Sequence, residues 1–201
     1  MGLWLAAAPL VLASASSVRR HLLEAAGIPV DVQPTNLDER AAEASAPRNN
    51  PSAVAAHLAR EKALRVTATA PGRLVVGADQ TLALGDRRFD KPGDRAAARA
   101  QLQALAGRAH ELHAAVAVAR DGGVLFEHVA IARLIMRPLS DAVLDRYLDA
   151  AGAAVTASVG GYQLEALGVH LFERIEGDHF TILGLPLLPL LAYLRAEGSL
   201  A

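Results

Sequence analysis

Two hydrophobic patterns alternate along this chain, and their alternation restricts the folds it can adopt. Short apolar runs predict buried strands, and segments with apolar residues three and four positions apart predict helices. The strands are predicted at 9–14, 28–32 and 74–78, and the helices at 53–68, 94–106 and 139–150. A further helix ends at Gly27, because a glycine there is placed to terminate it. Strands that alternate with helices favour an α/β fold.

The second half of the chain adds an antiparallel component to this sheet. Two longer apolar segments, 110–119 and 123–135, flank Asp121-Gly122-Gly123, which is a strong hairpin signal. The resulting sheet is expected to be mixed, and 201 residues suffice for one domain or two small lobes sharing a core. A loop is predicted over 33–51 and a turn or hairpin over 85–94, with Ser52 as the cap of the helix at 53–68 and Ser140 as the cap of the helix at 139–150. Further strands are predicted over 169–175 and 179–183, and a closing helix follows Pro186.

The charge balance argues against a polyanionic partner. The chain has 20 basic and 21 acidic residues, so no global charge attracts a nucleic acid polymer or an anionic membrane. Aromatic residues make up only 4%, which is poor for binding single strands by base stacking. The chain has no cysteine, which excludes disulfides and thiolate sites and fits a reducing cytosol. We therefore expect a cytoplasmic protein.

The apolar start, MGLWLAAAPLVLASASS, has small residues that resemble a signal-peptidase site. It lacks the basic residues that precede the apolar part of a signal peptide, and Pro9 interrupts it. Residues 2–14 are also too few to span a bilayer. The segment around Leu10 to Leu12 is therefore interpreted as a buried first strand, with no membrane partner.

An acid follows the apolar run Leu74-Val75-Val76 after two small residues, in the sequence VVGADQT. Ligands of open α/β sheets bind beyond the carboxyl ends of strands, and Asp79 would lie at such an end. There it could hold a divalent metal or accept a proton from water. The alternative is a structural Asp79 that caps the next turn or pairs with Arg87 or Arg88, and this stretch alone favours neither.

Cationic residues occur at places that suit an anion. Arg19 and Arg20 lie in the first turn of a helix that follows a serine-rich turn beginning at Ser14. A helix N-terminus already attracts anions, so two arginines there are unfavourable unless an anion lies between. Lys62 falls on the apolar side of its helix, and Lys91 precedes a proline. Each of these cations taken singly is more commonly a solvated surface charge.

Other chemistries find little support in the sequence. His110 and His113 are three residues apart in a strand-like segment, where they face opposite ways, so a metal pair is not expected. No G-x-S-x-G or Walker pattern occurs. Glu39 and Glu165 lie in predicted loops, where an acid is most often only surface.

Taken in order, several motifs resemble those of the Maf family of nucleoside triphosphate pyrophosphatases. They are LASASSVRRHLLEAAG, LDE, LAREKA, VVGADQT, KPGDRAAARAQLQALAGRAHEL, SVGGYQLEALG and LFERIEGDHFTILGLPLLPLLAYL. The resemblance extends from residue 10 to about 195. It implies one domain over 1–201, with an elongated, twisted mixed sheet, helices on its faces and two lobes around a deep cleft. Such proteins are often homodimers.

The resemblance also implies an activity, which is hydrolysis of a nucleoside triphosphate between the α and β phosphates to a monophosphate and pyrophosphate. A divalent cation, Mg²⁺ or Mn²⁺, is needed. Asp79 matches the acid that accepts a proton from the attacking water and, with Glu39, is a candidate metal ligand. Lys62 and Lys91 match catalytic lysines that stabilise negative charge. Ser14, Arg19 and Arg20 match a loop that grips the triphosphate.

The nucleotide preference implied by the resemblance is less uniform. Gln80 and Glu165 match positions occupied by Gln and Glu in members that prefer 7-methyl-GTP, whereas the dTTP and UTP type has Thr and Gln. Val18, at a third position, matches neither type. The alternatives are a dTTP and UTP pyrophosphatase, a hydrolase of deaminated purine triphosphates such as ITP or XTP, and a non-catalytic nucleotide-binding regulator of cell division.

Three positions depart from the family pattern. Ser17 stands where proline is common, and Ala166 stands where glycine is usual. Asp90 precedes Lys91-Pro92, where glycine is common. The expectation is a less rigid first loop and crowding near Glu165.

Overall fold

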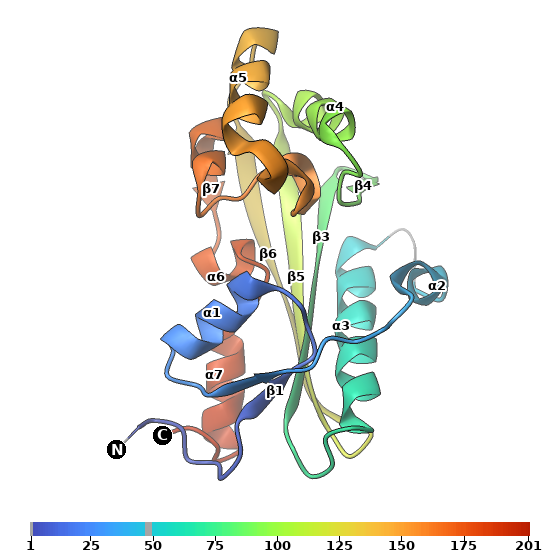
Figure 1. Cartoon of the computed structure of the whole chain (residues 1–201), viewed down its shortest axis with the longest axis vertical. Coiled ribbons are helices and arrows are strands. Elements are labelled where there is room, and N and C mark those ends of the chain that lie inside the picture. Colours follow the sequence, from blue (N-terminus) through green and yellow to red (C-terminus); the bar gives the residue numbers. More distant parts are fainter. Residues whose placement is uncertain (1, 47–49) are drawn as a thin grey trace. The chain divides into compact units, whose positions relative to one another are not determined.

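The computed structural model describes residues 2–46 and 50–201 of the chain. In this part, seven strands form one mixed sheet in the order β2-β1-β3-β5-β6-β7, with β4 paired to β3 (Figure 1). The strands are β1 Leu10–Leu12, β2 Val30–Val32, β3 Val75–Leu84, β4 Arg87–Phe89, β5 Ala109–Arg120, β6 Gly123–Met136 and β7 Phe172–Glu176. β1 is parallel to β2 and β3, whereas the β3–β4 and β6–β7 pairs are antiparallel. The predicted mixed α/β sheet is confirmed.

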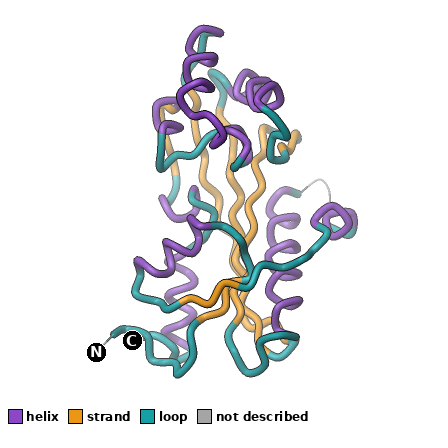
Figure 2. The backbone as a smooth tube through the Cα atoms, viewed as in Figure 1, coloured by secondary structure: helices purple, strands orange, loops and turns teal. Residues whose placement is uncertain are grey.

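Figure 2 distinguishes the helices and strands of the described chain by colour. The α-helices are α1 Ser17–Ala25, α2 Glu39–Ala44, α3 Pro51–Thr67, α4 Arg95–Leu105, α5 Asp141–Ala151, α6 His179–Ile182 and α7 Leu187–Ala196. Three short 3₁₀ helices are η1 Gly152–Thr156, η2 Val159–Gly161 and η3 Leu167–Leu171. No helix of the described residues has the length and apolar character needed to cross a membrane.

The chain divides into two compact units. Unit 1 comprises residues 1–80, 114–130 and 179–201, and unit 2 comprises 81–113 and 131–178. β3, β5 and β6 contribute residues to both units. The predicted deep cleft, the two-lobed shape and the single domain stay predictions.

In unit 1, the two faces of β3 pack against different layers. Leu74, Val76 and Ala78 join an apolar cluster with residues of β1, α1 and α7. Val75 joins a second cluster, made largely of alanines from α3 and β5. Figure 1 shows α3 on one side of these strands and α1 and α7 on the other. Because side chains alternate along a strand, the residue types of β3 decide what meets each helical layer.

Gly77 allows α3 to approach β3 closely. A Cβ atom at this position would lie 2.1 Å from the carbonyl oxygen of Ala59 and 2.6 Å from the backbone nitrogen of Ala63. Both contacts are with helix backbone, which cannot move aside as a flexible side chain can. The glycine therefore sets the distance between α3 and the strand, and with it the reach of side chains on the buried face of α3.

Gly77→Ala is expected to destabilise the protein by about 3 kcal/mol, the upper part of the usual cost of overpacking. The physical reason is that α3 must move away from β3 to admit the methyl group. Urea unfolding measures the change. Gly93→Ala is the control, because a Cβ there meets nothing within 4 Å. Equal stability of the two variants would contradict the close approach of α3.

In unit 2, a glycine-rich loop is held by buried polar contacts. Tyr147 donates a hydrogen bond from its hydroxyl to the carbonyl of Gly161 (3.2 Å), and Gly160 donates its N–H to Gln101 (3.0 Å). The Tyr162 hydroxyl lies 2.8 Å from Nε2 of His110. His110 is 1% exposed, and burial lowers its pKa to about 4. The loop that precedes Glu165 is therefore anchored within its own unit.

Because His110 is buried with a lowered pKa, we expect the free energy of unfolding to fall in mild acid. Its pKa falls from 6.5 in the unfolded chain to about 4 in the folded one, so below pH 6.5 only the unfolded state takes up the proton. The free energy of unfolding is expected to fall by about 2 kcal/mol between pH 7 and pH 5. His110→Gln should abolish that slope in urea unfolding, whereas His21→Gln, an exposed position, should retain it. A slope that survives in His110→Gln would refute this assignment.

Several sequence predictions are confirmed in detail. Leu10–Leu12 forms the fully buried first strand β1. Ser140 caps α5 by accepting a hydrogen bond from the N–H of Val143. The β5–β6 turn places Asp121 and Gly122 at positive φ, 49° and 80°, as an Asp-Gly hairpin turn requires. The 85–94 segment forms the β3–β4 hairpin turn and β4, as predicted.

The predicted loop over 33–51 is wrong in its middle. Residues Glu39–Ala44 form α2, with Asp38 as its N-cap. The segment shows no apolar stripe, and it is held instead by Leu37 and Ala42 packing against Val54 and Leu58 of α3. Residues 47–49 of that prediction lie outside the described residues. The cap of α3 is Asn50 with Pro51 in the first turn, and not Ser52.

Two strand predictions near the C-terminus also need correction. Residues 179–183 contain β-prone Phe, Thr and Ile, yet His179–Ile182 forms the short helix α6. Gly184 ends this turn at φ +85°, which glycine adopts without strain. The strand predicted over 169–175 is shifted, because η3 continues to Leu171 and β7 begins at Phe172. Tertiary packing here outweighs local strand propensity.

Candidate active site

Asp79 lies within β3 and not at its end, which corrects the expectation from the sequence. β3 continues to Leu84, whereas its parallel neighbour β1 ends at Leu12, opposite Val76. The last backbone contact between them is from the N–H of Ala13 to the carbonyl of Val76 (2.8 Å). Asp79 is therefore three residues past the carboxyl end of β1, the kind of place where α/β sheets bind ligands.

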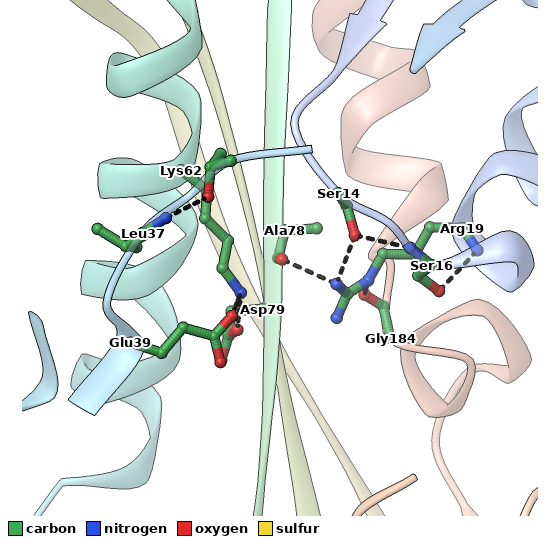
Figure 3. Close-up of polar contacts among 10 residues, drawn as sticks. Ser14, Ser16, Arg19, Leu37, Glu39, Lys62, Ala78, Asp79 and Gly184 are labelled. Carbon is green, nitrogen blue, oxygen red and sulfur yellow. Dashed lines mark hydrogen bonds and ion pairs between the residues drawn. The ribbon is translucent and has the colours of Figure 1, made fainter. Parts of the chain in front are cut away.

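Lys62 connects two carboxylates in unit 1. Its Nζ lies 2.6 Å from Oδ1 of Asp79 and 2.7 Å from Oε1 of Glu39 (Figure 3). Lys62 and Asp79 are each 8% exposed, whereas the Glu39 side chain is 57% exposed. Lys62 is four residues after Leu58 on the buried face of α3, so the helix period delivers it toward β3. Glu39, Lys62 and Asp79 are therefore in contact, and their predicted catalytic and metal-binding roles stay predictions.

The electrostatic setting favours proton transfer at Asp79. Burial raises the pKa of the Asp79 carboxyl above its usual value, while the positive charges of Lys62 and Arg19 act in the opposite direction. Glu39 adds a smaller raising effect. A carboxylate with a raised pKa is a stronger base than an exposed aspartate. The Lys62–Asp79 pair is thus nearly dry and lies close to a solvent-exposed acid.

Arg19 is held by the protein on the other side of β3. Its Nε donates to the carbonyl of Gly184 (2.8 Å), and its Nη1 donates to the carbonyl of Ala78 (2.9 Å) and to Oγ of Ser14 (3.2 Å) (Figure 3). Ser14 also accepts the N–H of Ser16, which is the N-cap of α1. Burial lowers the pKa of the Arg19 guanidinium, and Asp79 and Glu39 oppose that change. Internal hydrogen bonds therefore hold this arginine, and the predicted roles of Arg19 and Ser14 in gripping the triphosphate stay predictions.

Gln80 faces away from Asp79 and contacts α6. Its Nε2 donates to the carbonyls of Thr181 and Ile182, both at 3.0 Å. No sequence signal predicts this contact or the one at Gly184, because over 100 residues separate the partners. These backbone acceptors are the part of the site that sequence reasoning missed.

The two other α1 residues are not drawn into this cluster. Arg20 is exposed and forms a 3.6 Å ion pair with Glu24 on its own helix. Val18 is half-buried. Ser17 is the first residue of α1, a position that suits proline but does not require it. Their predicted roles in binding the triphosphate stay predictions.

Lys91 and Glu165 belong to unit 2. Lys91 is exposed between β4 and α4. Glu165 is exposed in a turn closed by hydrogen bonds from the N–H groups of Ala166 (3.2 Å) and Gly168 (3.0 Å) to the carbonyl of Gln163. The expected crowding at Ala166, where glycine is usual in the family, stays a prediction. The functional roles of Lys91 and Glu165 stay predictions.

The carboxylates of Asp79 and Glu39, which both contact Lys62, are suitable ligands for a hard divalent cation. Asp79 and Glu39 supply carboxylate oxygens, which Mg²⁺ and Mn²⁺ prefer. Among the residues that the structure describes, no three or more His, Cys, Asp or Glu side chains gather as a metal-binding group. A two-carboxylate set suits Mg²⁺, which commonly keeps waters and takes substrate phosphates as its remaining ligands.

The fold and the site define an α/β protein in which a buried lysine, Lys62, contacts the buried Asp79 and the exposed Glu39. This group lies beyond the carboxyl end of the parallel strand β1. The chain belongs to the family of Maf-like proteins, whose model matches residues 9–197. It is 59% identical, over the full length of both chains, to the nucleoside triphosphate pyrophosphatase of Bradyrhizobium diazoefficiens and to that of Rhodopseudomonas palustris strain CGA009. It is 51% identical to the 7-methyl-GTP pyrophosphatase of Rhizobium etli, covering 95% of this chain and 97% of the relative.

Proposed function

We propose that this protein is a nucleoside triphosphate pyrophosphatase that releases pyrophosphate and a nucleoside monophosphate. The observation that carries the proposal is the buried contact between Lys62 and Asp79, with Glu39 on the same ammonium group. Full-length relatives named for this activity support it. The chemistry needs a base for water and positive charge for the phosphates, and these residues supply both.

In the proposed reaction, Asp79 accepts a proton from the water that attacks phosphorus. A new bond forms between the water oxygen and phosphorus, and the bond to the bridging oxygen between the α and β phosphates breaks. Lys62, 2.6 Å from the base, orients it and offers positive charge to the phosphate oxygens. Lys91 is proposed as a second cation for the same charge. No covalent enzyme intermediate is required.

We propose that Asp79 and Glu39 hold a divalent cation, Mg²⁺ or Mn²⁺, when the nucleotide binds. Such a cation neutralises charge on the phosphate oxygens. Glu39 is the more exposed ligand, so it is the side chain that can turn from Lys62 toward a metal–nucleotide complex. Lys62 then keeps its contact with Asp79 and the positive charge stays beside the base.

For the nucleotide, we propose a preference for 7-methyl-GTP. A relative with that name at 51% identity supports this, while relatives at higher identity carry only the general name. Glu165 is exposed on its turn and could accept N–H groups of a guanine edge or face a cationic methylated ring. Both hydrogens of the Gln80 amide are used inside the protein, so Glu165 carries this part of the proposal.

The test is release of pyrophosphate by the purified protein with Mg²⁺ or Mn²⁺ and 7-methyl-GTP, GTP, dTTP, UTP, CTP and ITP. We expect 7-methyl-GTP to be cleaved fastest, and Glu165→Gln to lower its advantage while Glu173→Gln, another exposed acid of unit 2, does not. Preference for dTTP and UTP, or for ITP, would support the proposed pyrophosphatase reaction but contradict the proposed preference for 7-methyl-GTP. Tight binding without hydrolysis would make the regulator of cell division the better hypothesis.

We also propose that the protein is cytoplasmic, as its lack of cysteine favours, and that it forms a homodimer, as the resemblance to its family implies. The proposed substrates are nucleotides of the cytoplasmic pool. Cell fractionation and sedimentation of the purified chain test the two statements separately, and the proposed reaction depends on neither.

A further inference from the structure

The strand that carries Asp79 loses its neighbour just before it reaches the acid. The carbonyl of Val76 accepts a hydrogen bond from Ala13, the residue after β1. Along a strand, alternate carbonyls point the same way, so Ala78 presents its carbonyl to the side that β1 has left. Nη1 of Arg19 donates to that carbonyl at 2.9 Å. The side chain thus replaces a missing strand next to Asp79.

Gln80 anchors the strand on the other side of the acid. Side chains of neighbouring residues in a strand point to opposite faces, so Gln80 faces the layer of α1 and α6 while Asp79 faces α3. Both partners of its amide are carbonyl oxygens of α6, so the nitrogen must face them and both of its hydrogens are used. The Gln80 amide therefore has no N–H left to donate to a nucleotide base.

The two anchors meet at one turn. Arg19 holds the carbonyl of Gly184, and Gln80 holds those of Thr181 and Ile182. A Cβ at Gly184 would lie 3.2 Å from Nη2 of Arg19, a tight contact, and 3.6 Å from Cδ of Gln80, an ordinary one, so the missing side chain leaves room for the guanidinium. With Ser14, these contacts use three of the five N–H donors of Arg19.

We propose that Arg19 and Gln80 are positioning residues, which fix the backbone on either side of Asp79 by holding β3 to the turn of residues 181–184. The proposal rests on the function proposed above, and it gives these residues another role than gripping the triphosphate or selecting the base. Three features support it: hydrogen bonds to backbone carbonyls, side chains on the face opposite the acid, and a glycine where they converge.

The test uses Arg19→Lys and Gln80→Glu in the full chain. Lysine keeps the charge but cannot reach three acceptors in the planar arrangement of a guanidinium. Glutamate keeps the size of Gln80 and turns an acceptor toward two carbonyls. We expect kcat to fall about 100-fold in both, the effect of a misplaced catalytic group, with KM unchanged and the order of nucleotide preference retained. Gly184→Ala should also lower kcat, but alanine strains the backbone at φ +85°, so its stability is measured beside its rate.

The controls are Arg65→Lys and Gln103→Glu, both exposed and outside the site, which should keep wild-type kinetics. If Arg19→Lys keeps kcat but raises KM for every nucleotide, Arg19 binds phosphate and the proposal fails for it. If Gln80→Glu changes the order of preference at unchanged kcat, Gln80 reads the base. Wild-type kinetics in all three variants would also refute the proposal.

A second readout separates this proposal from the function itself. Amide hydrogen exchange of residues 78–81, measured without nucleotide, should be about tenfold faster in Arg19→Lys and Gln80→Glu, because the hydrogen bonds that hold them are lost. If the wild-type protein cleaves no nucleotide, the proposed function fails, and exchange alone still decides whether these residues hold β3. Unchanged exchange would mean that they do not.

Discussion

Asp79→Asn is expected to lower kcat for pyrophosphate release about a thousandfold, within the range of effects seen when a general base is lost. An amide of the same size cannot accept the proton from water. Lys62 keeps Glu39 as a partner at 2.7 Å, so the substitution leaves no unpaired buried charge. Stability should therefore change little while the reaction nearly stops. Rates of pyrophosphate release and urea unfolding measure the two effects.

The matched control for this variant is Asp31→Asn. Asp31 is in β2 of the same unit and pairs with Arg73 at 2.7 Å, away from Lys62. It should keep the wild-type rate. Binding of a nucleotide analogue that cannot be cleaved between the α and β phosphates should survive in Asp79→Asn. A rate within tenfold of wild type would mean that another group accepts the proton.

Much of this site could be predicted from local sequence. The period of α3 placed Lys62 on the buried face with Leu58, and the apolar run of Leu74, Val75 and Val76 indicated that a buried strand leads to Asp79. Both inferences hold because they rest on neighbours in the chain. The contact between them also follows from Gly77, whose missing side chain lets α3 lie against the strand.

What the sequence could not reveal depends on distant partners or on weak local signals. From its place in the first turn of a helix, Arg19 is expected to bind an anion. In the structure its guanidinium donates a hydrogen bond to the carbonyl of Gly184, 165 residues away. Gln80 is likewise hydrogen-bonded to α6. The sequence predicted a strand in place of this helix, because the segment contains the β-prone residues Phe180, Thr181 and Ile182. Glu39 was expected in a loop, and only the packing of α2 against α3 brings it to Lys62.

Lys62→Met is expected to have effects on both activity and stability, and they arise from different physics. Methionine keeps the apolar stem of the side chain and removes the charge. Without the ammonium, the phosphates lose a nearby cation, and kcat/KM should fall about 100-fold to 1000-fold. Lys62→Arg, which keeps the charge, should retain more of that activity. Steady-state pyrophosphate release measures both variants.

The same substitution is expected to cost about 3 kcal/mol of stability at pH 7, because it leaves the carboxylate of Asp79 buried without its nearest partner. Loss of Lys62 removes an effect that lowers the pKa of Asp79, so this pKa, already raised by burial, rises further. The cost is present above the folded-state pKa and disappears as pH falls toward the unfolded value of 3.8. In urea unfolding, the difference in free energy of unfolding between Lys62→Met and the wild type should be smaller at pH 5 than at pH 7.

The double variant Lys62→Met/Asp79→Asn separates charge from packing. It removes the buried carboxylate along with its partner, so most of the stability lost in Lys62→Met should return at pH 7. Activity should stay as low as in Asp79→Asn, since the base is absent. If the double variant is as unstable as Lys62→Met, the loss comes from the packing of the longer side chain against β3. Recovery of stability without recovery of activity would show that the ion pair between α3 and β3 is required for the reaction and can be replaced in the fold.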